Sequence, residues 1–293
     1  MDLTSYLQER KSLIEAELTR SLKDSEIPKT LRQAMTYSLE AGGKRLRPIL
    51  TLAGAEAVGG SLENVLPIAV ALEMIHTFSL IHDDLPAMDD DDLRRGKPTN
   101  HKVFGEAVAI LAGDALLAEA FLMMTKRKDS IPADRFMEVI HDIAIASGAR
   151  GMTGGQVIDM EATGHEISEQ SVEAIHRHKT GKLLTVSVVV GAKLSGASSL
   201  HLNALQKYGE AIGLAFQIAD DILDLEGTEE EIGKDVRSDV SNAKATYPSI
   251  FGLEGARAKA KKLVDDAIGA LETFDERAEP LRLLAHYIIE RRK

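Results

Sequence analysis

The chain has 293 residues, 44% of them hydrophobic, so it is long enough to bury the core of one large domain or two average ones. A formal net charge of −11 argues against non-specific binding to nucleic acid or anionic membranes, so any anionic ligand should meet a local basic patch. The absence of cysteine excludes disulfides, thiolate metal sites and cysteine nucleophiles. With no apolar leader and no stretch approaching 18 uncharged apolar residues, we expect a soluble cytoplasmic protein without membrane insertion.

Helical periodicity extends through nearly the whole chain. The first clear stretch opens at Pro28 and stops at the Gly42–Gly43 pair. The β-branched run at 183–192 would suit a buried strand, but helical neighbours and the lack of a partner strand favour a buried helix. We therefore predict an all-α fold, a single large helical bundle with one domain spanning residues 1–293. The further helices are expected at about 48–58, 62–84, 106–125, 132–149, 168–178, 181–194, 199–224, 254–273 and 279–291.

The apolar helix expected at 62–84 carries two adjacent aspartates, Asp83 and Asp84, at its C-terminal end. Two carboxylates there repel each other and face the negative end of the helix dipole, so they cost stability unless a cation compensates. In an unbroken helix Asp89 would lie about 120° away from Asp83. Pro86 supplies a break, because it biases the preceding residue away from the helical conformation and lets the chain turn back. From this stretch alone, a solvated acidic loop is the alternative.

The stretch FQIADDILD at 216–224 presents a second aspartate cluster on an apolar helix. Asp220 and Asp224 lie at i and i+4, about 40° apart on one face, where they would repel each other without a cation. The short likeness between SLIHDD and FQIADD suggests two similar helix ends that face each other across a cavity. Oxygen-only ligands of this kind suit Mg²⁺, which keeps several waters and binds through a few carboxylates plus substrate phosphates. No twelve-residue calcium loop is present.

If metals bridge to phosphates, cationic side chains should accompany the aspartate clusters. The sequence contains several groups of such side chains. Each group alone is typical of a plain surface, but their combination with two aspartate clusters indicates a phosphorylated ligand. No Walker motif and no strand-linked dinucleotide motif occurs, so neither ATP nor NAD is indicated. The basic side chains are Arg94 and Arg95 after the first cluster, Lys44, Arg45 and Arg47 in GGKRLRP, Lys179 in RHKTGK and Lys234 in GKD.

In these motifs the chain resembles the short-chain trans-isoprenyl diphosphate synthases, the polyprenyl synthetase family, and within it the bacterial farnesyl type. The resemblance covers nearly the whole sequence, with order and spacing in agreement. It implies a helical bundle around a deep central cavity, a homodimer, and aspartate motifs on opposite walls. The motifs are GGKRLRP at 42–48, DDLPAMDDDDLRRGKPTNH at 83–101, LAGDALL at 111–117, GGQVID at 154–159, HKTGKL at 178–183, FQIADDILD at 216–224 and GKD at 233–235.

The resemblance implies a Mg²⁺-dependent condensation of isopentenyl diphosphate with dimethylallyl and geranyl diphosphate, giving (2E,6E)-farnesyl diphosphate and pyrophosphate. Asp83, Asp89 and Asp220 would hold about three Mg²⁺ on the allylic diphosphate. Asp84, Asp221 and Asp224 would be neighbours or holders of metal-bound water. Because the metals neutralise the developing charge of the leaving group, no nucleophilic serine or cysteine is needed.

The resemblance also implies two separate diphosphate sites, which would orient the alkene against the allylic carbon. Thr180 and Gln217 would direct oxygen atoms at the carbocation, and the departing pyrophosphate would remove the proton. The allylic diphosphate would be bound by Arg94, Lys179 and Lys234, and isopentenyl diphosphate by Lys44, Arg47, His76 and Arg95. From periodicity alone, His76 is also typical of a core histidine.

Product length is expected to depend on Phe78 and Ser79, which the resemblance implies form the floor of the chain pocket. Phe78 lies five residues before Asp83, about 7.5 Å along the helix axis, although periodicity alone would make it a core residue. A geranylgeranyl diphosphate synthase is therefore the nearest alternative. A terpene cyclase would not need the second basic pocket, and a non-catalytic partner subunit would typically lose aspartates that are intact here. The pair Gln156 and Asp159, at i and i+3, is of a type found facing the cavity.

Overall fold

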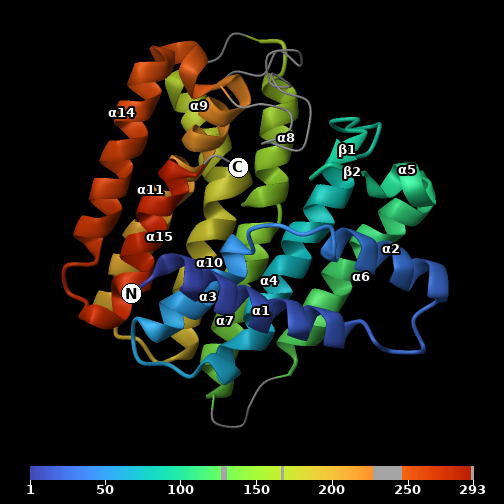
Figure 1. The fold of residues 1–293 in the computed structure, drawn as a ribbon, viewed down its shortest axis with the longest axis horizontal. Helices are drawn as coiled ribbons and strands as arrows, with labels where there is room; N and C mark the ends of the chain where they lie inside the picture. The colour runs from blue at the N-terminus through green and yellow to red at the C-terminus, as the bar shows by residue number, and fades with distance from the viewer. Residues whose placement is uncertain (127–130, 166–167, 227–245, 292–293) are drawn as a thin grey trace.

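The computed structural model describes residues 1–126, 131–165, 168–226 and 246–291, and these residues confirm the all-α prediction (Figure 1). Only one pair of two-residue strands interrupts the helices of the described residues. The first half contains α1 (Leu3–Ser21), α2 (Lys29–Leu39), α3 (Leu46–Glu56), α4 (Leu62–Asp83), β1 (Leu93–Arg94), β2 (Lys97–Pro98), α5 (Asn100–Phe104) and α6 (Glu106–Met124). The second half contains α7 (Ala133–Ser147), α8 (Met152–Ala162), α9 (Glu169–His176), the π-helical turn η1 (Arg177–Gly181), α10 (Lys182–Leu194), α11 (Ser199–Glu226), α14 (Tyr247–Ala270), the 3₁₀ turn η2 (Glu276–Ala278) and α15 (Glu279–Glu290).

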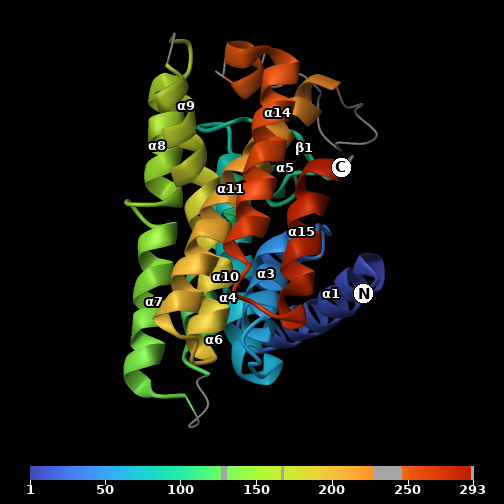
Figure 2. The ribbon, with the colours of Figure 1, turned by 90° about the vertical axis from the view of Figure 1, so that its left-hand side faces the viewer.

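The long helices form a bundle in which α4, α10 and α11 are central. Extensive contacts join α4 to α6, α10 to α3 and α11 to both α10 and α14. Figure 2 shows α7 and α8 on one side of the bundle, with α10 and α11 between them and the pair α14 and α15. One large apolar core includes side chains from α1 through α15, and the single domain over residues 1–293 stays a prediction.

Two helices, α4 and α6, are long and apolar enough to cross a membrane by length and composition. In the bundle they pack against each other, and α4 is buried on nearly every face from Ile68 to Ile75. Core helices of soluble proteins have the same composition, so the two helices carry no assignment to a membrane.

Three helices, α1, α5 and α8, add to those expected from the sequence. The helical pattern of α8 is masked by glycines, which have a low helix propensity. Gly155 has a packing reason, because a Cβ atom built there would lie 2.2 Å from the backbone nitrogen of Lys179. The glycine therefore lets α8 lie directly against η1, the turn that carries Lys179.

The strands β1 and β2 form a hairpin that the sequence analysis did not predict. Leu93 pairs with Pro98 and Arg94 with Lys97, so the turn consists of Arg95 and Gly96. Both turn residues have positive φ angles, 55° and 73°, which is the conformation of the tightest hairpin turns. The hairpin is too short to show an alternating pattern. It places Arg94 in a strand and Arg95 in the turn, so the two adjacent arginines have different partners.

Candidate active site at the ends of α4 and α11

A cavity of about 1200 Å³ opens among α1, α3, α4, η1, α11 and α15, and most of the predicted site residues line it. This volume exceeds the usual range for small-ligand pockets, so two substrates have room. Within the described residues, Asp83 and Asp220 belong to its lining but Asp84, Asp89, Asp221 and Asp224 do not. Lys234 lies outside the described residues. The other predicted residues in the lining are Lys44, Arg47, His76, Phe78, Ser79, Arg94, Arg95, Lys179, Thr180 and Gln217.

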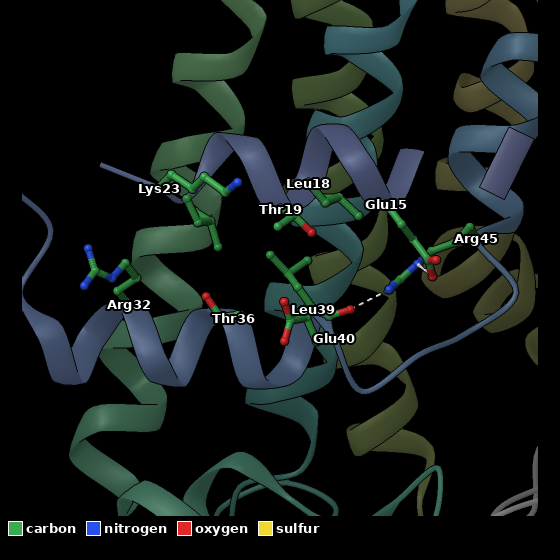
Figure 3. Close-up of a pocket in the computed structure, with 10 residues that line it drawn as sticks. Glu15, Leu18, Thr19, Lys23, Arg32, Thr36, Leu39, Glu40 and Arg45 are labelled. Atoms are coloured by element: carbon green, nitrogen blue, oxygen red, sulfur yellow. Dashed lines mark hydrogen bonds and ion pairs between the residues drawn. The ribbon is translucent and has the colours of Figure 1, made fainter. Parts of the chain in front are cut away.

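A second cavity of about 460 Å³ lies between α1 and α2, and Figure 3 shows Arg45 at one end of its lining. Arg45 lines both cavities, and its guanidinium donates to the Leu39 carbonyl oxygen at the end of α2 and, at 2.8 Å, to Glu73 Oε1 on α4. None of the predicted site residues lines the smaller cavity in the described part of the chain. Arg45, the residue before α3, therefore joins this helix to α2 and α4 between the two cavities.

The chain turns back after α4 as the sequence predicted. The backbone nitrogen of Asp89 donates to the Asp83 carbonyl oxygen at 2.9 Å, three residues beyond Pro86. Burial raises the pKa of Asp83 to about 6, against the attraction of Lys179 and with the repulsion of Asp89. A cation bound beside this buried carboxyl would stabilise its ionised form.

Asp84 is not among the residues that line the cavity, but it anchors Arg94, which is. The Arg94 Nε donates to Asp84 Oδ1 at 2.6 Å, and Arg94 Nη2 also reaches Asp91 Oδ2 at 3.4 Å. Burial raises the pKa of Asp84 even so. Asp92 pairs with Lys102 at 2.6 Å on the surface. The aspartates that follow Asp89 are therefore not uniformly solvated, because Asp91 helps to hold a cavity-lining arginine.

Asp220 is the member of the second cluster that lines the cavity, and it pairs with Arg291 just beyond α15. Arg291 Nη2 lies 2.6 Å from Asp220 Oδ1, and its guanidinium stacks 4.1 Å from the centroid of the Phe216 ring. Arg291 also lines the cavity. Sequence reasoning missed Arg291, since nothing but the basic character of the last three residues pointed to it. Asp221 and Asp224 are only 2% and 5% exposed.

No group of three acidic or histidine side chains is close enough to hold a metal ion by itself within the described residues. The carboxylates of Asp83 and Asp220 nevertheless line the same cavity. Such a sparse, oxygen-only donor set fits Mg²⁺, which keeps several waters and completes its shell with substrate phosphates.

Four cationic or titratable side chains make a basic pocket, defined here as Lys44, Arg47, His76 and Arg95. Burial lowers the pKa of Lys44 to about 8 and that of Arg47 to about 10. Burial, with repulsion from Arg47 and Arg95, lowers the pKa of His76 well below its usual value, so the imidazole is neutral. Buried cations are costly without a counter-charge, and this pocket therefore suits an anionic ligand.

Glu73 and Gly43 hold this basic pocket in place. Glu73 lies one turn before His76 on α4, pairs with Arg45, and exerts an attraction that partly offsets the lowered pKa of Arg47. The side chain of Arg95 donates to the Gly42 carbonyl oxygen and lies against Gly43, where a Cβ atom would come within 2.7 Å of the guanidinium. The glycine pair of GGKRLRP thus makes room for an arginine from the hairpin.

Lys179, Thr180 and Gln217 meet where η1 crosses α11. Lys179 Nζ pairs with Asp159 Oδ2 of α8 at 2.6 Å, and Gln156 of the same helix lines the cavity. Thr180 Oγ1 donates to Gln217 Oε1 at 2.9 Å. The turn η1 is π-helical, a local widening that is frequent at functional sites.

Phe78 and Ser79 line the cavity on the same helix as the first aspartates. The ring of Phe78 packs edge-on against His82, with centroids 5.5 Å apart, and His82 Nε2 contacts the Ile110 carbonyl oxygen at 3.1 Å. Ser79 Oγ donates to the His76 carbonyl oxygen at 2.9 Å. This apolar part of the cavity is therefore bounded by α4 and by Ile110 of α6.

Comparison with known proteins identifies the family. Residues 28–283 match the family model described as polyprenyl synthetase. The farnesyl diphosphate synthase of Bacillus subtilis (strain 168) is 50% identical over 266 residues, 90% of each chain. The geranylgeranyl diphosphate synthase of Cyanophora paradoxa is 47% identical over 99% of this chain and 97% of its own. A crystal structure of an FPP/GFPP synthase from Zymomonas mobilis aligns with a TM-score of 0.89 at 40% identity over 98% of both chains. The chain therefore belongs to the polyprenyl synthetase family.

Proposed function

We propose that this prenyltransferase condenses isopentenyl diphosphate with dimethylallyl and then geranyl diphosphate, giving (2E,6E)-farnesyl diphosphate and pyrophosphate. The observation that carries the proposal is one cavity lined both by aspartates, Asp83 and Asp220, and by a basic pocket of buried cations. A single diphosphate with its metals would not need both groups. The similarity to the farnesyl diphosphate synthase of Bacillus subtilis supports the same product.

Asp83, Asp89 and Asp220 would hold about three Mg²⁺. Asp84, Asp221 and Asp224 would be neighbours of these ligands or holders of metal-bound water. Bound Mg²⁺ would supply charge neutralisation to the departing pyrophosphate. Arg94, Lys179 and Lys234 would bind the same leaving group. The allylic C–O bond breaks, and Gln217 Oε1 and the Thr180 hydroxyl oxygen face the resulting carbocation. The alkene of isopentenyl diphosphate then forms the new C–C bond, and pyrophosphate takes the proton.

The direct test of the function is chromatography of the products formed by the purified protein with Mg²⁺, isopentenyl diphosphate and each allylic primer. We expect farnesyl diphosphate from both dimethylallyl and geranyl diphosphate. Geranylgeranyl diphosphate as the main product would favour the nearest alternative, which the similarity to the Cyanophora paradoxa protein supports. Cyclic hydrocarbons from farnesyl diphosphate alone would identify a terpene cyclase, and no turnover would contradict the proposal.

Lys44→Ala should raise the KM for isopentenyl diphosphate more than the KM for geranyl diphosphate, because Lys44 lies in the basic pocket. The pKa of Lys44, lowered to about 8 by burial, adds a pH dependence. Above pH 8 the free enzyme increasingly has a neutral Lys44, so kcat/KM for isopentenyl diphosphate should fall there. The matched variant Lys44→Arg should keep its charge and lose this alkaline limb. An equal effect of Lys44→Ala on both substrates would contradict the two-site assignment.

We also propose that the protein is a cytoplasmic homodimer that uses the apolar face of α6. Leu111 and Leu122 on this helix are 58% and 55% exposed, and Ile110 and Phe121 beside them are also exposed. Sedimentation should therefore give about twice the chain mass of 31.8 kDa. The double variant Leu111→Lys/Leu122→Lys should sediment as a monomer, whereas Leu200→Lys, at an exposed leucine of α11, should not. A monomeric parent protein would refute the dimer.

A further inference from the structure

Asp221 is not among the residues that line the cavity, and its carboxylate lies in a network of donors. Gln217 Nε2 donates to Asp221 Oδ1 at 3.1 Å. Asp221 Oδ2 accepts from the backbone nitrogen of Tyr247 at 2.9 Å and contacts His176 Nε2 at 3.1 Å. The side chain is 2% exposed, so these three partners, from α9, α11 and α14, form its surroundings.

The network determines which end of the Gln217 amide faces the cavity. A carboxylate only accepts hydrogen bonds, so the NH₂ group of Gln217 must point to Asp221. Gln217 Oε1 then points to Thr180, whose hydroxyl must donate to it, as the 2.9 Å contact indicates. Thr180 and Gln217 both line the cavity. As a result, the lone pairs of two oxygen atoms, and no N–H group of this amide, are available to a positive centre there.

We propose that Asp221 and His176 are positioning residues that lock the Gln217 amide with its oxygen toward the reacting carbon. This inference deepens the proposed function and rests on it. An amide turned the other way would present the positive end of its dipole to a carbocation, so the lock acts on the transition state and not on diphosphate binding.

The position of His176 beside Asp221 is fixed by contacts with its neighbours. It is the last residue of α9, directly before η1 with its Thr180, and its ring stacks on Tyr247 at 6.2 Å between centroids. The Tyr247 hydroxyl donates to Glu173 Oε1 at 2.5 Å, one turn before His176. The acceptor-only carboxylate requires an N–H at His176 Nε2, so this histidine also acts as a donor.

The test is Asp221→Asn, which keeps the shape but supplies an NH₂ group and so allows the Gln217 amide to flip. We expect kcat to fall about tenfold to a hundredfold while both KM values stay within about twofold. In a Gln217→Leu background, Asp221→Asn should produce no further loss of kcat. The control Tyr208→Phe removes another buried hydrogen bond of α11, to the Leu281 carbonyl oxygen, and should lower stability without changing kcat.

A second measurement distinguishes a role of Asp221 in orienting the Gln217 amide from a role in metal binding. The Mg²⁺ concentration needed for pyrophosphate to raise the melting temperature should be unchanged in Asp221→Asn and raised in Asp220→Asn. An equal increase of this Mg²⁺ concentration in both variants would overturn the proposal. Independent losses of kcat in the Gln217→Leu/Asp221→Asn double variant would also overturn it. The effects of Gln217→Leu and Asp221→Asn on the free energy of unfolding, measured with denaturant, should be non-additive. Additive effects would also overturn the proposal. A parent protein that makes no prenyl product while these effects on unfolding are non-additive would refute the proposed function and the catalytic role of the amide, and only the orientation of the Gln217 amide by Asp221 would stand.

Discussion

Asp83→Asn should lower kcat by about a hundredfold to a thousandfold and, in the absence of Mg²⁺, make the protein more stable. The loss of activity follows because this carboxylate would hold the metals that stabilise the departing pyrophosphate. The gain in stability follows from the pKa of Asp83, which burial raises to about 6. A carboxyl with a raised folded-state pKa favours the folded protein at low pH, and this contribution is lost as the pH rises through 6. At pH 7 the neutral asparagine should therefore raise the free energy of unfolding by on the order of 2 kcal/mol.

Asp220→Asn is the matched comparison, with the same expected loss of kcat but the opposite effect on stability. Asp220 pairs with Arg291, whose side chain is nearly buried, so its neutralisation would leave a buried guanidinium without its counter-charge. Melting temperatures in EDTA at pH 7, measured beside kcat, test both variants. Near-normal turnover in either would contradict the metal assignment, and a destabilised Asp83→Asn would contradict the interpretation of its pKa.

The sequence predicted the aspartate end of α4 well because the determining features are local. An apolar helix, two carboxylates at its C-terminus and Pro86 specify where the helix ends and that the chain turns back. The roles of Lys44 and Lys179 were accessible because the motifs that contain them, GGKRLRP and HKTGKL, carry the resemblance to the family. These predictions needed no knowledge of contacts between distant segments.

The features that the sequence could not supply depend on contacts between distant segments. The pairing of Arg291 with Asp220 links residues 71 positions apart, and no local pattern distinguishes Arg291 from its basic neighbours. The direction of Asp221 depends on His176 and on the backbone of Tyr247, because adjacent aspartates on a helix necessarily face different sides. α8 was missed because its two glycines lower its helix propensity, and one of them, Gly155, is required for the contact with η1.

Phe78→Ala should lengthen the product from farnesyl toward geranylgeranyl diphosphate. The Phe78 ring lines the cavity on α4, edge-on to His82, so its removal deepens the apolar part of the cavity without touching the basic pocket. The growing chain is apolar and gains by burial, so the extra space favours a further condensation before release. Chromatography of the products with geranyl diphosphate as primer measures the shift.

Ser79→Ala is the control for this prediction, because it changes the next residue of the same wall. The Ser79 hydroxyl donates to the His76 carbonyl oxygen within the helix, so its removal leaves the depth of the cavity nearly unchanged. This variant should keep the farnesyl product. If Phe78→Ala also keeps it, the floor of the chain pocket lies elsewhere, and Ile110 of α6 and Met152 of α8, which line the same cavity, are the next positions to truncate. A shift in Phe78→Ala alone would place the limit on chain length at a single ring.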